Sequence, residues 1–181
     1  MTTRLGVLSA LVLSLMAALI VLPPISTARH RTSPVVSPTT RTLSYTPPCR
    51  SGDVYRNNGR IAAAMSLGVL TGGLLSAALV LGVGLSTGLM LGNLAAKLPL
   101  WFLVVSYVPH ALLEIPGIAL AGGAGLSSLL LLGARRPPIS LFARAWLTAV
   151  VLSQVLLMSS AVVECHVTPW GIRLLAQLTI G

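Results

Sequence analysis

The sequence is short of charged side chains, above all of acidic ones. Only 3 of its 181 residues are Asp or Glu, and charged residues make up 8% of the chain, against about 25% in an ordinary soluble domain. Aromatic residues are also scarce at 4%, whereas 55% of the residues are hydrophobic. So few charges cannot cover a water-exposed surface, and the composition therefore indicates an integral membrane protein of one domain.

Several functional classes lack their sequence signatures. The 12 Lys and Arg residues are scattered through loops and form no basic helix or aromatic-interleaved patch, which argues against nucleic-acid binding and fits contact with lipid headgroups. The sequence holds no Ser/His/Asp or Cys/His nucleophile set, phosphate loop or dinucleotide fingerprint in a suitable context. We therefore expect a non-enzymatic protein without a cofactor.

The N-terminal part divides into an apolar run and a polar segment. Leu5 to Leu22 is uncharged, follows Arg4 and ends before two prolines, so residues 1–24 are expected to form a first span that acts as a signal anchor. A signal peptide cleaved near Ala28 is the rival interpretation. Residues 25–60 contain six arginines and many Pro, Ser and Thr residues, which predicts an irregular loop.

Residues 61–169 are expected to form a helical membrane domain. Residues 61–96 carry no charge and are too long for one ordinary span, so they predict a hairpin of two short spans with its turn at residues 82–84. Glycines spaced four residues apart predict smooth faces for close helix packing. They are Gly68, Gly72, Gly84, Gly88 and Gly92.

Prolines interrupt the next apolar stretch. Residues 100–108 are expected to enter the membrane as a half-helix that breaks near Pro109, followed by a full span over residues 112–133. A last span is expected over residues 145–163, and a short apolar tail, residues 170–181, could lie in the interface. The expected fold is an all-α membrane protein with about five transmembrane helices and one re-entrant half-helix.

His110 and Glu114 form the most informative pair in the chain. They lie four residues apart, so a helix would place them on one face, and Pro109 and Pro116 bracket them. Ionisable groups in hydrocarbon usually face a protein interior or a water-filled cavity.

Three interpretations compete for this pair. It could fix broken backbone and bridge helices, which is the favoured interpretation, or relay protons in a transport cavity together with Glu164. A metal site would need Glu164 or His166 to complete it, and no recognised ligand spacing supports one. Glu164 itself could instead be an interfacial carboxylate.

Orientation and the cysteines are linked. A count of basic residues favours a cytoplasmic loop over residues 25–60, whereas the signal-anchor character of the first span and the Arg135-Arg136 cluster favour an N-terminus inside and a C-terminus outside. We choose the second arrangement. It places Cys49 and Cys165 together on the outer side, where a disulfide could form.

Separate motifs occur in a characteristic order. Asn57-Asn58 precedes the glycine-rich hairpin, Pro109-His110 leads through Glu114 to Pro116, a small-residue run ends at Gly125, and Glu164 is followed by Thr168-Pro169. Over residues 55–170 this order resembles the stage II sporulation protein M family of multispanning membrane proteins. Two positions depart from the family pattern: Ala111 replaces a glycine, and residues 86–88 replace an Asn-Gly.

The resemblance implies an inner-membrane protein of a bacterium or archaeon that works with partners. Its sporulation members are membrane scaffolds, so the leading expectation is a scaffold or assembly subunit that binds other membrane or extracytoplasmic proteins, as a homo- or hetero-oligomer. The alternative is a transporter or channel subunit with a site formed by His110, Glu114 and Glu164. A cavity that reaches the pair would favour transport, whereas a pair sealed in hydrogen bonds would favour a scaffold.

Overall fold

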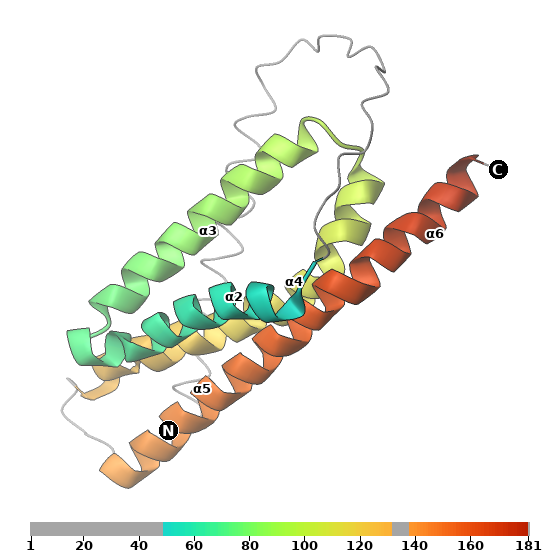
Figure 1. Ribbon diagram of the computed structural model, residues 1–181. Helices are drawn as coiled ribbons and strands as arrows, with labels where there is room; N and C mark the ends of the chain where they lie inside the picture. The colour runs from blue at the N-terminus through green and yellow to red at the C-terminus, as the bar shows by residue number, and fades with distance from the viewer. Residues whose placement is uncertain (1–48, 132–137, 181) are drawn as a thin grey trace.

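The structure is a computed structural model that describes residues 49–131 and 138–180, and all regular elements in these two ranges are helices. In chain order they are α2 (Ser51–Ser66), η2 (Leu67–Thr71), α3 (Leu74–Ala95), α4 (Leu100–Leu126), η3 (Ser127–Leu131), α5 (Ile139–Val162), η4 (Val163–Val167) and α6 (Thr168–Ile180). Figure 1 shows α2, the C-terminal part of α4 and α5 side by side, with α3 diverging from α2. The expected all-helical class is therefore confirmed.

Three helical stretches in the described residues are long and apolar enough to cross a membrane. They are Leu74–Ala95, Leu100–Leu129 and Ile139–Leu175. The expected first span, over residues 5–22, lies outside the described residues. Helix α2 is much less apolar than these three stretches, because it carries Asp53, two arginines and two asparagines. The chain thus has the helices of a membrane protein, although the expected total of five spans is not established.

The prediction of a loop over residues 25–60 is wrong for residues 51–60, which belong to α2. The prolines stop before Ser51, and an acidic residue in the first helical turn, Asp53, interacts favourably with the helix dipole. The buried residues of α2 are Gly59, Ala62, Met65 and Ser66. Their spacing of three to four residues makes one face that packs against α4 and α5.

The hairpin turns at Gly72 and Gly73, and the predicted turn at residues 82–84 is wrong. Both glycines have positive φ, 62° and 90°, a region that side chains with a Cβ rarely adopt. The amide of Gly73 donates to the carbonyl of Gly68 at 2.8 Å and closes η2. Gly72 is exposed and has open space around it, so it serves the turn and not the helix packing expected of it.

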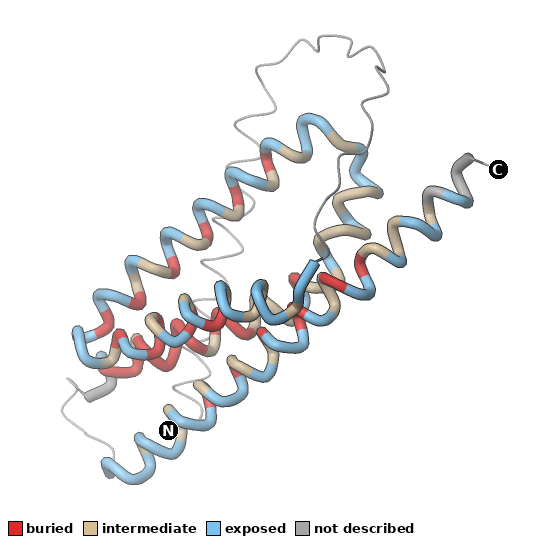
Figure 2. Tube along the Cα trace, viewed as in Figure 1, coloured by how far each residue is buried: buried red, intermediate tan, exposed pale blue. Residues whose placement is uncertain are grey.

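Residues 82–84 lie inside α3, which is one continuous helix of 22 residues. Its buried positions recur every four residues, and Figure 2 shows them along one side of the helix. They are Ser76, Val80, Gly84, Gly88 and Gly92. This is the smooth face that the glycine spacing predicts.

The helices approach one another closely at the hairpin end of the bundle. Ser76 donates from Oγ to the carbonyl of Met65 at 2.5 Å, which joins α3 to α2. A Cβ on Gly68 would collide with the Ser76 hydroxyl, and a Cβ on Gly125 would collide with both that hydroxyl and the Met65 carbonyl. Glycine is therefore required where η2, α3 and α4 meet.

Helix α4 is continuous through Pro109 and Pro116, so the predicted break and re-entrant half-helix are wrong. Each proline removes one intrahelical hydrogen bond, a loss that membrane helices tolerate when neighbouring helices cover the backbone. Figure 1 shows that the axis of α4 changes direction along its length. The prolines bend the helix without ending it.

Helices α5 and α6 form one long rod through η4, as Figure 1 shows. The span expected to end at residue 163 therefore continues, and residues 170–180 of the expected separate tail are helical. From Ile139 to Ile180 the rod contains 42 residues and is about 63 Å long at 1.5 Å per residue. This exceeds the hydrocarbon thickness of a bilayer, about 30 Å.

Candidate functional site

A polar cavity lies where the start of α2 meets α3, α4 and η4. Its volume is about 290 Å³. It is lined by Val54, Asn57 and Asn58 from α2, Thr87 and Met90 from α3, Tyr107, His110 and Glu114 from α4, and Glu164 from η4. The structure thus brings together all three residues that the sequence proposed as an intramembrane polar site.

His110 and Glu114 both face this cavity from one side of α4, as their spacing predicts. Glu114 accepts a hydrogen bond on Oε1 from Nδ2 of Asn58 at 3.0 Å, which connects α4 to α2. Tyr107 packs edge-on against the His110 ring, with ring centroids 5.2 Å apart. The pair is therefore held by two side chains, of which neither was assigned to the site from the sequence.

One nitrogen of the His110 ring has no hydrogen-bond partner. This atom, Nδ1, is buried. The backbone carbonyl of the same residue accepts a hydrogen bond from the Ser160 hydroxyl at 3.1 Å, which fixes α4 against α5. Because buried polar atoms usually find partners, the unpaired Nδ1 atom is unusual for a buried side chain.

Glu164 reaches the cavity from η4, a π-helical turn between α5 and α6. Pro169 lacks a backbone N–H, so the carbonyl of Cys165 loses its usual partner four residues later, and a wider turn accommodates the loss. Cys165 and Thr168 are buried, whereas His166 is exposed. The Thr-Pro motif thus lies directly beside the turn that carries Glu164.

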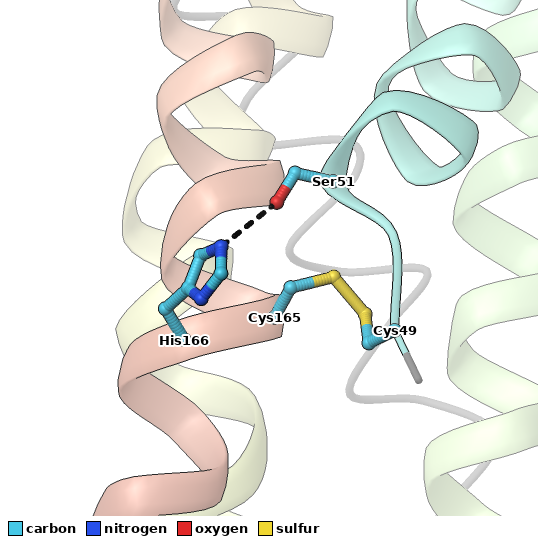
Figure 3. Close-up of a disulfide and its surroundings, with 4 residues drawn as sticks. All are labelled: Cys49, Ser51, Cys165 and His166. Atoms are coloured by element: carbon cyan, nitrogen blue, oxygen red, sulfur yellow. Dashed lines mark hydrogen bonds between the residues drawn. A yellow bond between two sulfur atoms is a disulfide. The ribbon is translucent and has the colours of Figure 1, made fainter. Parts of the chain in front are cut away.

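A disulfide joins Cys49 to Cys165, the pairing considered from the sequence (Figure 3). The two Cα atoms are 5.3 Å apart, and the cysteines are 116 residues apart in the sequence. Beside the disulfide, the Ser51 hydroxyl and Nε2 of His166 lie 3.4 Å apart at hydrogen-bond distance. The start of α2 is therefore tied to η4, and these are two of the elements that form the cavity.

Sequence reasoning missed several cavity residues. In the sequence, Asn57 and Asn58 stand out only as part of a family motif, and Thr87 only as a departure from the family pattern. The sequence did hold a signal for the asparagines, because two adjacent amides lie close to the start of the uncharged segment at residue 61. Nothing in the local sequence around Thr87 or Met90 predicts that they face this cavity, since both lie in a glycine-rich run on α3.

The cavity is lined by groups that can exchange protons and form hydrogen bonds with a ligand. Two of the three acidic residues of the chain line it, together with an imidazole, a phenol and two amides. Within residues 49–131 and 138–180, no group of three or more His, Cys, Asp or Glu side chains is placed to hold a metal ion. Carboxylate and amide oxygens would accept donors from a ligand, and His110 could donate or accept.

Comparison with known proteins identifies the family. Searches of curated proteins and of solved structures each found no match. The family model described as stage II sporulation protein M matches residues 6–169. The resemblance of the motifs rests on residues 55–170, and the match begins well before them. The matched residues include both cysteines of the disulfide and every residue of the cavity. The chain therefore belongs to the stage II sporulation protein M family.

Proposed function

We propose that the protein is a transporter or channel subunit in which protons or small cations pass through the cavity at His110, Glu114 and Glu164. The observation that carries this proposal is the 290 Å³ cavity, which reaches the His110–Glu114 pair. A pair that served only to seal broken backbone would be enclosed in hydrogen bonds. Here α4 is continuous, and the His110 ring keeps one buried nitrogen without a partner.

The charges around the cavity support a positively charged permeant. Among the described residues, two carboxylates line it and neither a lysine nor an arginine does. Ionisable groups at membrane depth commonly mark ion pathways and proton relays. Glu114, His110 and Tyr107 follow one another along α4 at spacings of three and four residues, an arrangement that suits stepwise proton transfer.

Proton flux into proteoliposomes tests this function. The purified full-length chain is reconstituted with a trapped pH-sensitive dye, and a potassium gradient with valinomycin supplies the driving force. We expect acidification faster than in protein-free vesicles, and Glu114→Gln or Glu164→Gln should reduce it to the protein-free rate. Asp53→Asn, which makes the same change in charge outside the cavity, should retain the flux. A wild-type rate equal to that of protein-free vesicles would contradict the proposal.

A non-enzymatic membrane scaffold is the second candidate, supported by the length of the α5–α6 rod. At about 63 Å the rod extends beyond a hydrocarbon core of about 30 Å. Its projecting part would offer a rigid surface to membrane or extracytoplasmic proteins, or to another copy of this chain. Affinity purification after chemical crosslinking tests this role, and loss of a specific partner on truncation after residue 169 is the expected result.

The topology and localisation that go with either role are also proposals. Disulfides persist in oxidising compartments, so the Cys49–Cys165 bond supports placing this end of the molecule outside the cytoplasm. The arrangement is then the expected one, with the N-terminus inside and the C-terminus outside the inner membrane of a bacterium or archaeon. Membrane-impermeant labelling of a cysteine introduced at residue 181 tests it.

A further inference from the structure

The cavity at His110, Glu114 and Glu164 is called the His–Glu cavity. A second, separate cavity lies on the other side of α2 and is lined by basic residues. It lies between α2 and α5 and has a volume of about 390 Å³. Arg56 and Arg60 line it one helical turn apart on α2, and Gln154 lines it from α5. Positions four residues apart on a helix present their side chains on the same face. Both guanidinium groups can therefore reach one bound group.

The polar groups of this cavity are mainly hydrogen-bond donors. The Tyr55 hydroxyl donates to Oε1 of Gln154 at 3.0 Å, so the donor nitrogen of this amide remains for a ligand. Each guanidinium presents several N–H donors in a planar fork that matches phosphate oxygens. Two forks and one amide favour an anion with several acceptor oxygens.

No acidic side chain of the protein lines this cavity. The chain has only 3 acidic residues, and all of them lie in the described part of the chain. Glu114 and Glu164 line the other cavity, and Asp53, in the first turn of α2, is not part of this one. Since no carboxylate of the chain lines the cavity, a negative charge inside it would come from another molecule.

The position of the cavity favours a lipid as that molecule. Helix α2 packs against α3, α4 and α5. Each of these helices lies in one of the three stretches that are apolar enough to cross a membrane. Arginines beside such helices are costly in hydrocarbon unless they reach headgroups or pair with an anion. Basic pockets between transmembrane helices bind phosphate-bearing lipid headgroups.

We propose that Arg56, Arg60 and Gln154 bind the phosphate headgroup of an anionic membrane lipid in the groove between α2 and α5. The phosphate accepts hydrogen bonds from both guanidinium groups and the amide. Gly52 leaves room beside the arginines, because a Cβ added to it would meet nothing within 4 Å, whereas Gly59 packs closely against Gln154 and Tyr55. The bound lipid supplies the negative charge that the chain does not place in this cavity.

Native mass spectrometry of the full-length protein, purified in mild detergent and supplied with phosphatidylglycerol or phosphatidylcholine, tests this site. We expect phosphatidylglycerol adducts to survive activation better than phosphatidylcholine adducts. Arg56→Gln and Arg60→Gln should each lower the retained fraction about fivefold, the change expected for one basic residue at an anionic surface. Arg144→Gln, an exposed arginine of α5 outside the cavity, is the matched control and should retain the lipid.

A second variant tests the site without removing a charge. Gly52→Leu places a side chain in the cavity where the protein itself leaves space, so the fold is expected to form while phosphatidylglycerol is excluded. Equal retention of phosphatidylglycerol by the wild type and this variant would overturn the proposal, as would equal retention of the two lipids by the wild type. The melting temperature of the protein is also measured with inorganic phosphate and with phosphatidylglycerol. If both raise it equally, the site binds a soluble anion and the proposal of a lipid ligand is wrong.

Discussion

Single residues at the hairpin end control how closely three helical segments approach. The backbone of Gly125 on α4 lies against the Met65 carbonyl of α2 and the Ser76 hydroxyl of α3. A backbone atom cannot move aside as a flexible side chain can, so any Cβ at this position must separate the helices. In the sequence Gly125 is one small residue within a run of them, and its role comes from what faces it.

Gly125→Ala is expected to destabilise the protein by about 1–3 kcal/mol, the usual cost of overpacking a well-packed site. Gly82→Ala is the matched control. Gly82 is also inside a helix, but it is exposed and a Cβ there would meet nothing within 4 Å, so alanine should be neutral or slightly stabilising through helix propensity. Thermal unfolding in detergent, followed by tryptophan fluorescence, measures both. Equal melting temperatures for the two variants would contradict the close approach at Gly125.

The chemical type of a residue decides whether the sequence alone could predict its place in the site. His110, Glu114 and Glu164 stand out because ionisable groups are rare in this chain, so scarcity alone identified them. Asn58 and Thr87 carry ordinary polar groups, and their place in the cavity depends on how α2 and α3 pack against α4. Contacts between residues 56 positions apart, such as Asn58 with Glu114, are not encoded in any local pattern.

At the scale of elements, the sequence predicted helices well and their ends poorly. Two glycines at residues 82–84 predict a turn there, yet in the described part of the chain only Gly72 and Gly73 adopt positive φ. A glycine in an apolar helix can equally provide a packing face, as Gly84 does. In α4 the prolines suggested a break, but a proline inside a covered membrane helix bends it instead.

One hydrogen bond between α4 and α5 comes from a serine side chain that bonds to the neighbouring helix instead of its own. The Ser160 hydroxyl donates to the His110 carbonyl, whereas the neighbouring Ser159 hydroxyl donates to Val155 within α5. Ser160→Ala is expected to cost about 0.5–1.5 kcal/mol, the net value of one hydrogen bond. Ser159→Ala, an exposed position, should change the stability less.

Chemical unfolding of both serine variants in the same detergent measures this difference. If Ser159→Ala and Ser160→Ala lowered the free energy of unfolding equally, the hydrogen bond between the helices would make no stabilising contribution of its own. If the flux through the His–Glu cavity also falls in Ser160→Ala alone, the bond positions His110 as well as stabilising the helix pair.

At the scale of the whole molecule, one covalent link joins two of the elements that form the cavity. The Cys49–Cys165 disulfide joins the residue just before α2 to η4, so the helix that carries Asn57 and Asn58 is linked to the turn that carries Glu164. The sequence suggested this pairing only from the side of the membrane on which each cysteine would lie. That argument could place the cysteines in one compartment, but it could not place one of them in a π-helical turn.

Replacing the disulfide by Cys49→Ala together with Cys165→Ala is expected to lower the stability by about 2–5 kcal/mol, because the bond closes a loop of more than 100 residues in the unfolded chain. Guanidinium unfolding in detergent measures the loss. The wild type treated with reductant should show the same loss, which separates the effect of the bond from the effect of the alanines. Since the bond also holds α2 against η4, the flux assay should show reduced activity in both samples. If reduction lowered the stability but left the flux unchanged, the disulfide would strengthen the fold without shaping the cavity.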